Sequence, residues 1–308
     1  MRNVLEVVNP FDLIKVGSVE LSGWNDVDAM LDVAGALYRN RDEWLPAYKR
    51  IEILKETARL MTGRAEELAV LIASEGGKPL VDARVEVTRA IDGVELCIHE
   101  IGQMAGREIP MDLTRAGSGR IAFTQREPIG VVVAASAFNH PLNLIVHQVA
   151  PAVAAGCPVI VKPALDTPLS CKVFVDILHQ AGLPQDWCRF AACHNDVAEQ
   201  MITDPRVGFF SFIGSARVGW MLRSKLAPGT RCALEHGGAA PVIVDEIEKT
   251  LIHVKQQGMT TVIVEQNAVR ALELADRAII LDTGSIVFDG TASEVLENTQ
   301  LREEYLAI

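Results

Sequence analysis

Short runs of β-branched and other apolar residues alternate with amphipathic stretches through the middle of the chain. Four such runs span residues 130–136, 158–162, 207–212 and 231–235. Runs of this length are typical of buried strands, while the stretches between them repeat apolar residues at helical spacing and mostly end near Gly or Pro. Alternating strands and helices predict an α/β fold with a doubly wound, Rossmann-like parallel sheet.

Helical periodicity dominates the region before these runs. From residue 26 to about residue 105, apolar side chains recur every three or four positions, as in Val27, Met30 and Leu31. This spacing predicts an N-terminal region of packing helices. A short strand and a turn are expected before it, and the apolar–polar alternation of residues 119–128 predicts a β-ribbon between the helices and the sheet.

The pattern changes near residue 245, where shorter elements begin. We predict a small C-terminal α/β appendage and a division into two domains, residues 1–245 and 246–308. The elements expected in the appendage are a helix at 246–257, a strand at 259–264, a helix at 268–275, strands at 278–281 and 286–288, and a helix at 293–298.

Charge and cysteine usage narrow the classes of partner. The chain has 29 Lys and Arg against 40 Asp and Glu, a net charge of −11, which disfavours nucleic acid and anionic lipid surfaces. The six cysteines lack disulfide or zinc spacing and are expected to be reduced thiols, with no metal site. No signal peptide or membrane-spanning run is evident, so a cytoplasmic location and a small soluble ligand are expected.

Polar residues stand at the end of each predicted strand. These are Asn139, Lys162, Ser215 and Glu235. Ligands of such sheets bind beyond the carboxyl ends of the strands, so the four residues predict a site. Gly214 and Ser215 also begin a helix, whose free N–H groups suit a pyrophosphate. Taken singly, Asn139 also fits a helix cap and Lys162 a solvated loop residue.

The same segments resemble motifs of the aldehyde dehydrogenase superfamily. The resemblance covers about residues 4–245 and matches the dinucleotide-binding half of that family. It is carried by four motifs in the family's order: Phe138-Asn139-His140-Pro141, Lys162 to Pro168, Phe212 to Gly219, and Glu235-His236-Gly237-Gly238.

This resemblance implies oxidation of a small aldehyde to a carboxylic acid with NAD or NADP. Asn139 would polarise the carbonyl oxygen and Glu235 would activate water. Leu165 replaces a Glu that commonly clasps the ribose hydroxyls, so NADP becomes at least as good a candidate as NAD, although Asp166 keeps the choice open. The residues expected to contact the cofactor are Phe138, Lys162, Ala164, Leu165, Gly214, Ser215 and Gly237. A ribbon like residues 119–128 serves oligomerisation in the family, so a homo-oligomer is expected.

The nucleophilic cysteine of the family is missing from its expected place. It would lie near position 269, where the chain has Val269, and no cysteine follows Cys232. We therefore expect that this chain binds a dinucleotide but is inactive alone. Two alternatives stay open: a non-catalytic nucleotide-binding or regulatory module, and a truncated or chimeric product without an evolved function.

The last part of the chain resembles a different family. Residues 246–308 are similar to the C-terminal end of an ABC-transporter ATPase of the branched-chain amino-acid importer type. The matching segments are Thr261 to Ala268, Ala275 to Arg277, Leu281 to Val287 and Arg302 to Leu306. The segment lacks a phosphate-binding G-x-x-x-x-G-K-[ST] loop, so no ATP hydrolysis is expected. The resemblance implies that the chain is a chimera of two family fragments.

Overall fold

The protein is described by a computed structural model that covers residues 3–237, 251–263, 268–282 and 285–301. The chain divides into two compact units, Met1–Glu235 and His236–Ile308. The predicted domain boundary at residue 245 lies outside the described residues and stays a prediction.

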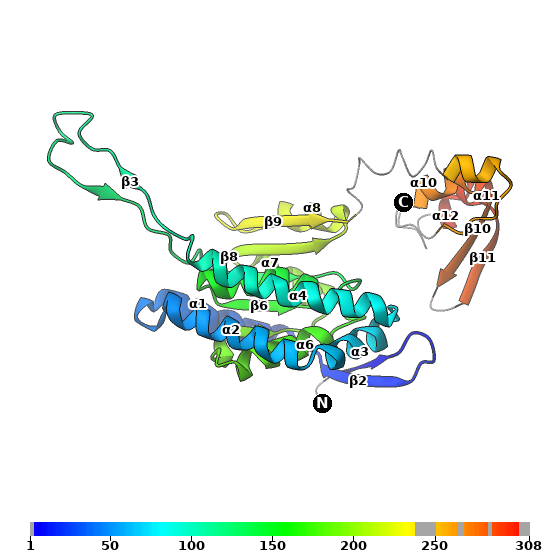
Figure 1. The fold of residues 1–308 in the computed structure, drawn as a ribbon, viewed down its shortest axis with the longest axis horizontal. Helices are drawn as coiled ribbons and strands as arrows, with labels where there is room; N and C mark the ends of the chain where they lie inside the picture. The colour runs from blue at the N-terminus through cyan, green and yellow to red at the C-terminus, as the bar shows by residue number, and fades with distance from the viewer. Residues whose placement is uncertain (1–2, 238–250, 264–267, 283–284, 302–308) are drawn as a thin grey trace. The chain divides into compact units, whose positions relative to one another are not determined.

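A five-stranded sheet forms the centre of the first unit (Figure 1). Its strand order is β7-β6-β5-β8-β9, and the registers of β5 with β6, β5 with β8, and β6 with β7 are all parallel. Successive strands run outward from β5 on one side, and the chain then returns to the other side at β8. This reversal creates a switch point between β5 and β8, as predicted for a doubly wound sheet. The strands are β5 Val131–Ala135, β6 Val159–Lys162, β7 Cys188–Phe190, β8 Val207–Gly214 and β9 Arg231–His236.

Strand β5 is buried along its whole length because helices cover both faces of the sheet. Val132 and Ala134 belong to one apolar core, and the alternate residues Val131 and Val133 belong to the other. Side chains of a strand point alternately to opposite faces, so a continuous run of small and β-branched residues serves both cores. The helices of the sheet region are α1 Trp24–Arg39, α5 Asn143–Ala155, α6 Leu169–Gln180, α7 Asn195–Thr203 and α8 Ala216–Ser224.

Three long helices form the predicted N-terminal helical region. They are α2 Ala47–Gly63, α3 Ala65–Gly76 and α4 Leu80–Ile101, and their apolar faces contribute to the same core as α5 and α6. Upstream, the single strand expected before residue 24 is an antiparallel hairpin of β1 Val4–Val8 and β2 Lys15–Glu20. Short 3₁₀ turns occur at Arg41–Glu43 and Gln185–Trp187.

Two glycines bring the first residues of β5 and β8 together. A Cβ at Gly130, where φ is +136°, would lie 3.1 Å from the Cα of Gly208. A Cβ at Gly208 would lie 2.7 Å from the carbonyl oxygen of Ile129. The two backbones therefore approach more closely here than any side chain permits.

The predicted ribbon at 119–128 is much shorter than its sequence pattern. Only β4 Ala122–Phe123 forms a strand, and it pairs with β3 Glu108–Ile109. The segment that carries β3 extends away from α4 (Figure 1), and Ile121 and Phe123 are 88% and 73% exposed. Alternation predicts strand pairing, but without a core beneath it the ladder is short.

The second unit is a small α/β arrangement. Strands β10 Arg277–Asp282 and β11 Ser285–Thr291 pair antiparallel, and Leu272, Ile280, Ala292 and Val295 form the core beneath them. The helices are residues 251–256, α10 Ala268–Leu274, α11 Ala292–Glu297 and α12 Thr299–Leu301.

The predicted strand at 259–264 is wrong for the residues that are described. Residues 259–263 form no strand, and Val262 is 85% exposed. The β10–β11 sheet has two strands, so this apolar run has no described strand with which to pair. The other predicted elements of the unit are present within a few residues of their expected ends, except at the undescribed positions.

Candidate functional site

The carboxyl ends of the sheet strands bring the predicted site residues to one edge, here called the rim. The rim comprises the segment 136–139 after β5, Lys162 at the end of β6, Gly214 and Ser215 after β8, and Glu235 in β9. Two hydrogen bonds tie its loops together: the Ser136 N–H donates to the Lys162 carbonyl oxygen at 3.2 Å, and the Thr167 hydroxyl donates to the Phe138 carbonyl oxygen at 3.1 Å.

Lys162 is a half-buried cation, and nearby groups only partly offset the cost of removing its charge from water. Burial lowers the pKa of its ammonium group, and the nearby Cys193 and Asp166 only partly oppose that effect. Among the described residues, the side-chain ammonium group of Lys162 has no hydrogen bond or ion pair. A buried ammonium group without a partner is costly, so Lys162 would gain from a ligand rich in oxygen atoms.

Asn139 and Ser136 provide further polar atoms without partners at the end of β5. The Asn139 Oδ1 and the Ser136 Oγ are both buried and meet no hydrogen-bond partner in the described part of the chain. Phe138, between them, is 58% exposed. Buried polar atoms are normally satisfied, so this group suits a polar ligand or ordered water.

The start of α8 offers backbone N–H groups beside the rim. The Ser215 hydroxyl oxygen accepts a bond from the Val218 N–H at 3.4 Å and caps the helix, which leaves the hydroxyl hydrogen free to donate to a ligand. Gly214 has no side chain, and a Cβ here would lie 2.6 Å from the Phe212 ring, which would then have to move. An anion can therefore approach the positive end of the helix closely.

Leu165 and Ala164 lie in the loop after β6. Both are half-buried, and the Leu165 side chain packs against an apolar cluster that includes Val7, Val19 and Leu169. The Leu165 side chain therefore supports the loop through packing and brings no charge to the rim.

Glu235 and Gly237 come from the edge of the sheet. Strand β9 lies beside β8 and points the same way (Figure 1), so Glu235 is near the carboxyl end of its strand. Both residues are exposed, in contrast to Lys162.

Sequence reasoning missed three charged residues that contact the loops of the rim. Glu75 and Glu86 are buried carboxylates on α3 and α4, and Lys78 pairs with Glu86 at 2.5 Å. The signal was present, because Glu86 interrupts the apolar face formed by Ala83 and Val87. A charged residue at a core position requires a partner, and that requirement predicts a buried contact.

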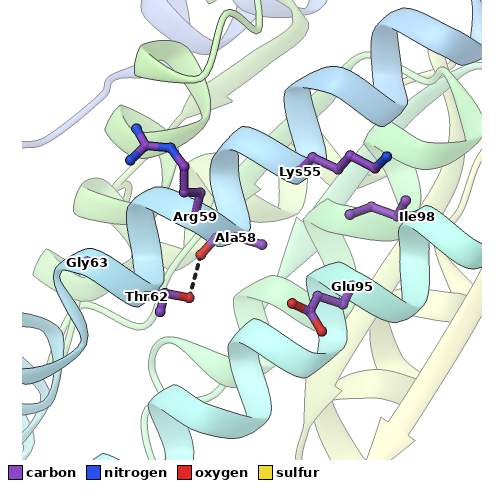
Figure 2. A pocket seen from close by; sticks show the side chains of 7 residues that line it. All are labelled: Lys55, Ala58, Arg59, Thr62, Gly63, Glu95 and Ile98. Atoms are coloured by element: carbon purple, nitrogen blue, oxygen red, sulfur yellow. Dashed lines mark hydrogen bonds between the residues drawn. The ribbon is translucent and has the colours of Figure 1, made fainter.

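Two hollows of about 460 Å³ lie away from the rim. One lies between α2 and α4, where Lys55 and Glu95 flank the smaller Ala58 and Ile98 (Figure 2). The other lies beside β2 and β7, near Arg189 and Phe190. Within the described residues, the second hollow includes one buried atom without a hydrogen-bond partner, the Nε of Arg189, and the first hollow includes none. Within the described residues, no cluster of three or more His, Cys, Asp or Glu is arranged to hold a metal ion, and no helix has the length and apolar character needed to cross a bilayer.

Comparison with known proteins agrees with the motifs at the rim. Residues 1–259 match the Aldehyde dehydrogenase family, beyond the predicted limit of residue 245. The chain is 35% identical over 243 residues to the putative aldehyde-dehydrogenase-like protein y4uC of Sinorhizobium fredii, covering 78% of this chain and 46% of that protein. It is 32% identical to 3-sulfolactaldehyde dehydrogenase of Priestia aryabhattai, covering 82% of this chain and 53% of that enzyme.

Solved structures give the same result. Aldehyde dehydrogenase 21 from Physcomitrella patens, in complex with succinate, superposes with a TM-score of 0.73 at 32% identity and covers 84% of this chain and 56% of its own. Glyceraldehyde-3-phosphate dehydrogenase GapN from Methanocaldococcus jannaschii, complexed with NADP, superposes with a TM-score of 0.71 at 29% identity, covering 82% and 56%. The chain thus spans about half the length of the relatives it matches. With a parallel sheet of the same kind and a match over most of its residues, the chain belongs to the aldehyde dehydrogenase family.

Proposed function

We propose that the rim binds NAD or NADP. The observation that carries the proposal is Lys162, a half-buried ammonium group without a partner in the described residues, next to strand ends that carry unsatisfied polar atoms. Lys162 would donate to the adenosine ribose, and the Gly214–Ser215 helix start would hold the pyrophosphate. Phe138, Ala164, Leu165 and Gly237 complete the proposed contact set.

NADP is the cofactor that the chain suits at least as well as NAD. Leu165 places no carboxylate in the loop after β6, so a 2′-phosphate meets less repulsion there, while Lys162 supplies a positive charge. Asp166 is the one acidic residue of this loop and keeps NAD a candidate. Two of the similar solved structures are NADP complexes.

In a complete active site of this family, we expect Asn139 to donate to the carbonyl oxygen of an aldehyde and Glu235 to take a proton from water. The bound nicotinamide would accept a hydride. The chain itself provides no cysteine after Cys232, and burial raises the pKa of the Cys193 thiol to about 11. Thiols protonated at neutral pH are poor nucleophiles, so we propose dinucleotide binding without aldehyde oxidation by this chain.

A second candidate is a non-catalytic nucleotide-binding or regulatory module. It is favoured by the separate C-terminal unit, whose segment resembles an ABC-transporter ATPase fragment and which we propose as a chimeric addition.

The β3–β4 hairpin supports the prediction of a homo-oligomer. Its apolar side chains Ile109, Ile121 and Phe123 are exposed and could pack against a second copy of the chain. A cytoplasmic location remains a prediction from the sequence.

Isothermal titration with NAD and with NADP tests the proposal. We expect binding of one or both, and a loss of about tenfold in affinity for Lys162→Met, since one charge-assisted contact is removed. Lys172→Met is the matched control, because Lys172 is exposed on α6 and pairs with Asp176 at the surface. An absence of binding, or equal losses in both variants, contradicts the proposal. NAD(P)H production from an aldehyde contradicts the predicted inactivity.

A further inference from the structure

Glu86 is a buried carboxylate on α4 that contacts the loop of Asn139 without belonging to the rim. Its side chain is fully buried. It lies on the face of α4 that packs against the core, and the other buried residues of that face are apolar. Burying a carboxylate is costly, so its retention requires partners for both oxygens. The structure provides them from two different elements.

One oxygen of Glu86 replaces a missing cap at the start of α5. The N-cap position is Leu142, which has no side-chain acceptor. Glu86 Oε1 instead accepts from the Leu142 N–H at 2.9 Å and the Asn143 N–H at 3.1 Å. The first N–H groups of a helix need acceptors, and a negative charge there is favoured by the helix dipole.

The other carboxylate oxygen of Glu86 pairs with Lys78, which also contacts the turn of Asn139. Lys78 Nζ donates to Glu86 Oε2 at 2.5 Å and lies 2.9 Å from His140 Nδ1. An ammonium group can only donate, so His140 Nδ1 is the acceptor in its contact with Lys78, and the same nitrogen lies 3.3 Å from Glu86 Oε2. Lys78 thus links the buried carboxylate to the residue that follows Asn139.

The turn that carries Asn139 is consequently held at three points. Thr167 binds the Phe138 carbonyl oxygen before Asn139, Lys78 binds His140 after it, and Glu86 fixes the beginning of α5. Glu75 repeats the arrangement at the start of α6, where it accepts from the Leu169 N–H at 2.7 Å and from the Ser170 N–H at 2.9 Å.

We propose that Glu86, with its counterion Lys78, is a positioning residue that fixes the turn of Asn139 and thereby sets dinucleotide affinity. This inference rests on the proposed function. Glu86 touches neither the proposed cofactor contacts nor the reacting atoms, and it acts through the backbone of the turn. Its effect should therefore appear in ligand binding by the folded chain as well as in stability.

The test compares variants of the full chain by titration with NADP and by hydrogen exchange of the amides of residues 138–146. Glu86→Leu leaves the two α5 amides without an acceptor, so we expect faster exchange there and an NADP affinity about tenfold weaker. Val94→Ala, at a fully buried position on the same helix, is the control. It should lower stability and leave both the affinity and the exchange of this segment unchanged.

A conservative rescue separates positioning from simple stability. In the double variant Glu86→Gln with Lys78→Met, the amide oxygen can still accept from α5, the amide N–H can donate to His140, and no buried charge remains. We expect affinity within about twofold of wild type. If Glu86→Leu does not fold, the single variant Glu86→Gln is used in its place. The Gln side chain cannot place oxygen atoms toward both the α5 amides and the Lys78 ammonium group, so one contact becomes unfavourable. We expect NADP binding about threefold weaker and faster hydrogen exchange at residues 138–146.

The outcomes are distinct from those of the proposed function. If the wild-type chain binds neither NAD nor NADP, the proposed function is wrong. If hydrogen exchange at residues 138–146 is unchanged in the Glu86 variants, Glu86 does not fix the turn of Asn139, and the positioning role is wrong as well. Faster exchange with unchanged affinity overturns the positioning role. Faster exchange with weaker binding, restored in the double variant, supports it.

Discussion

The two compact units of the chain have hydrophobic cores of very different size. In the first unit, every residue of β5 is buried between two helical layers. In the described part of the second unit, a two-stranded sheet has a core of four buried residues, and Ile279, Leu281 and Ile286 remain exposed. Two strands with one covered face are marginal by themselves, whereas a sheet covered on both faces is held from either side.

This difference explains where a precise site can be built. The polar ends of β5, β6 and β8 are held in place because the strand interiors are locked by packing on both faces. The described residues of the second unit form no sheet that is covered on both faces in this way. Most of the family match likewise falls within the first unit.

Phe210→Ala is expected to have the largest effect on this contrast. Phe210 is fully buried in β8, so its truncation should lower the free energy of unfolding of the first unit by about 3–5 kcal/mol. Denaturant titration measures the change. Phe123→Ala in the exposed hairpin serves as the control and should cost little. Similar losses for both variants would remove the distinction between core and surface aromatics.

Ile280→Ala tests whether the second unit opens by itself. We expect a loss of about 2–3 kcal/mol in the free energy of unfolding, since Ile280 is one of the four buried core residues described in this unit. Hydrogen exchange should accelerate in β10 and β11 and stay unchanged in β5. Loss of protection in β5 would show that the two units unfold together, contrary to the comparison.

Arg206 and Arg277 compare ion pairs in the two units. The Arg206 side chain is partly buried and pairs with Asp204, Asp28 and Asp32, and the hydrogen bonds to these carboxylates raise its pKa. We expect Arg206→Leu to cost about 1–2 kcal/mol, because a partly buried network is screened less than a surface pair. Arg277→Leu, which removes one exposed pair with Asp289, should give no measurable change in the thermal transition.

Glu75 in the first unit is expected to make a modest, pH-dependent contribution to stability. Burial raises the pKa of its carboxyl group, opposed by hydrogen bonds from Ser170 and Leu169 and reinforced by the charge of Glu86. The folded chain therefore binds this proton more readily than the unfolded chain, in which the pKa is near its ordinary value of 4.5. The contribution of Glu75 to the free energy of unfolding thus declines as the pH rises from 4.5 through the raised folded-state pKa.

Glu75→Gln should abolish this part of the pH dependence. Unfolding measured for both proteins from about pH 5 to about pH 8 gives the difference in slope. Glu52→Gln, at an exposed carboxylate of α2, is the control and should retain the wild-type slope. Identical slopes for wild type and Glu75→Gln would mean that the carboxyl of Glu75 titrates alike in the folded and unfolded chains.

The sheet could be predicted from the sequence because its signal is local. Each run of β-branched residues predicted a strand, and the ends of these strands gave Asn139, Lys162 and Ser215 without knowledge of their contacts. Their roles in the site stay predictions. Apolar character alone misled at residues 259–263, where no strand partner is described.

The supports of the rim could not be predicted in the same way, because they depend on distant contacts. Glu86 meets the Leu142 N–H across 56 positions of sequence, and Glu75 meets the Leu169 N–H across 94. Pattern identifies a charge on an apolar face, but the partner depends on which helix packs there. The packing of Leu165 against the β1–β2 hairpin is of the same kind.

The contact between Gly130 and Gly208 has a consequence at the opposite end of the sheet. These glycines act as a spacer of minimal thickness between β5 and β8, whose far ends carry Asn139 and Ser215. A methyl group at either glycine would push the amino-terminal ends of β5 and β8 apart. The distance between the carboxyl ends of the two strands would then change as well. The width of the proposed binding edge would thus depend partly on two residues at the opposite end of the strands.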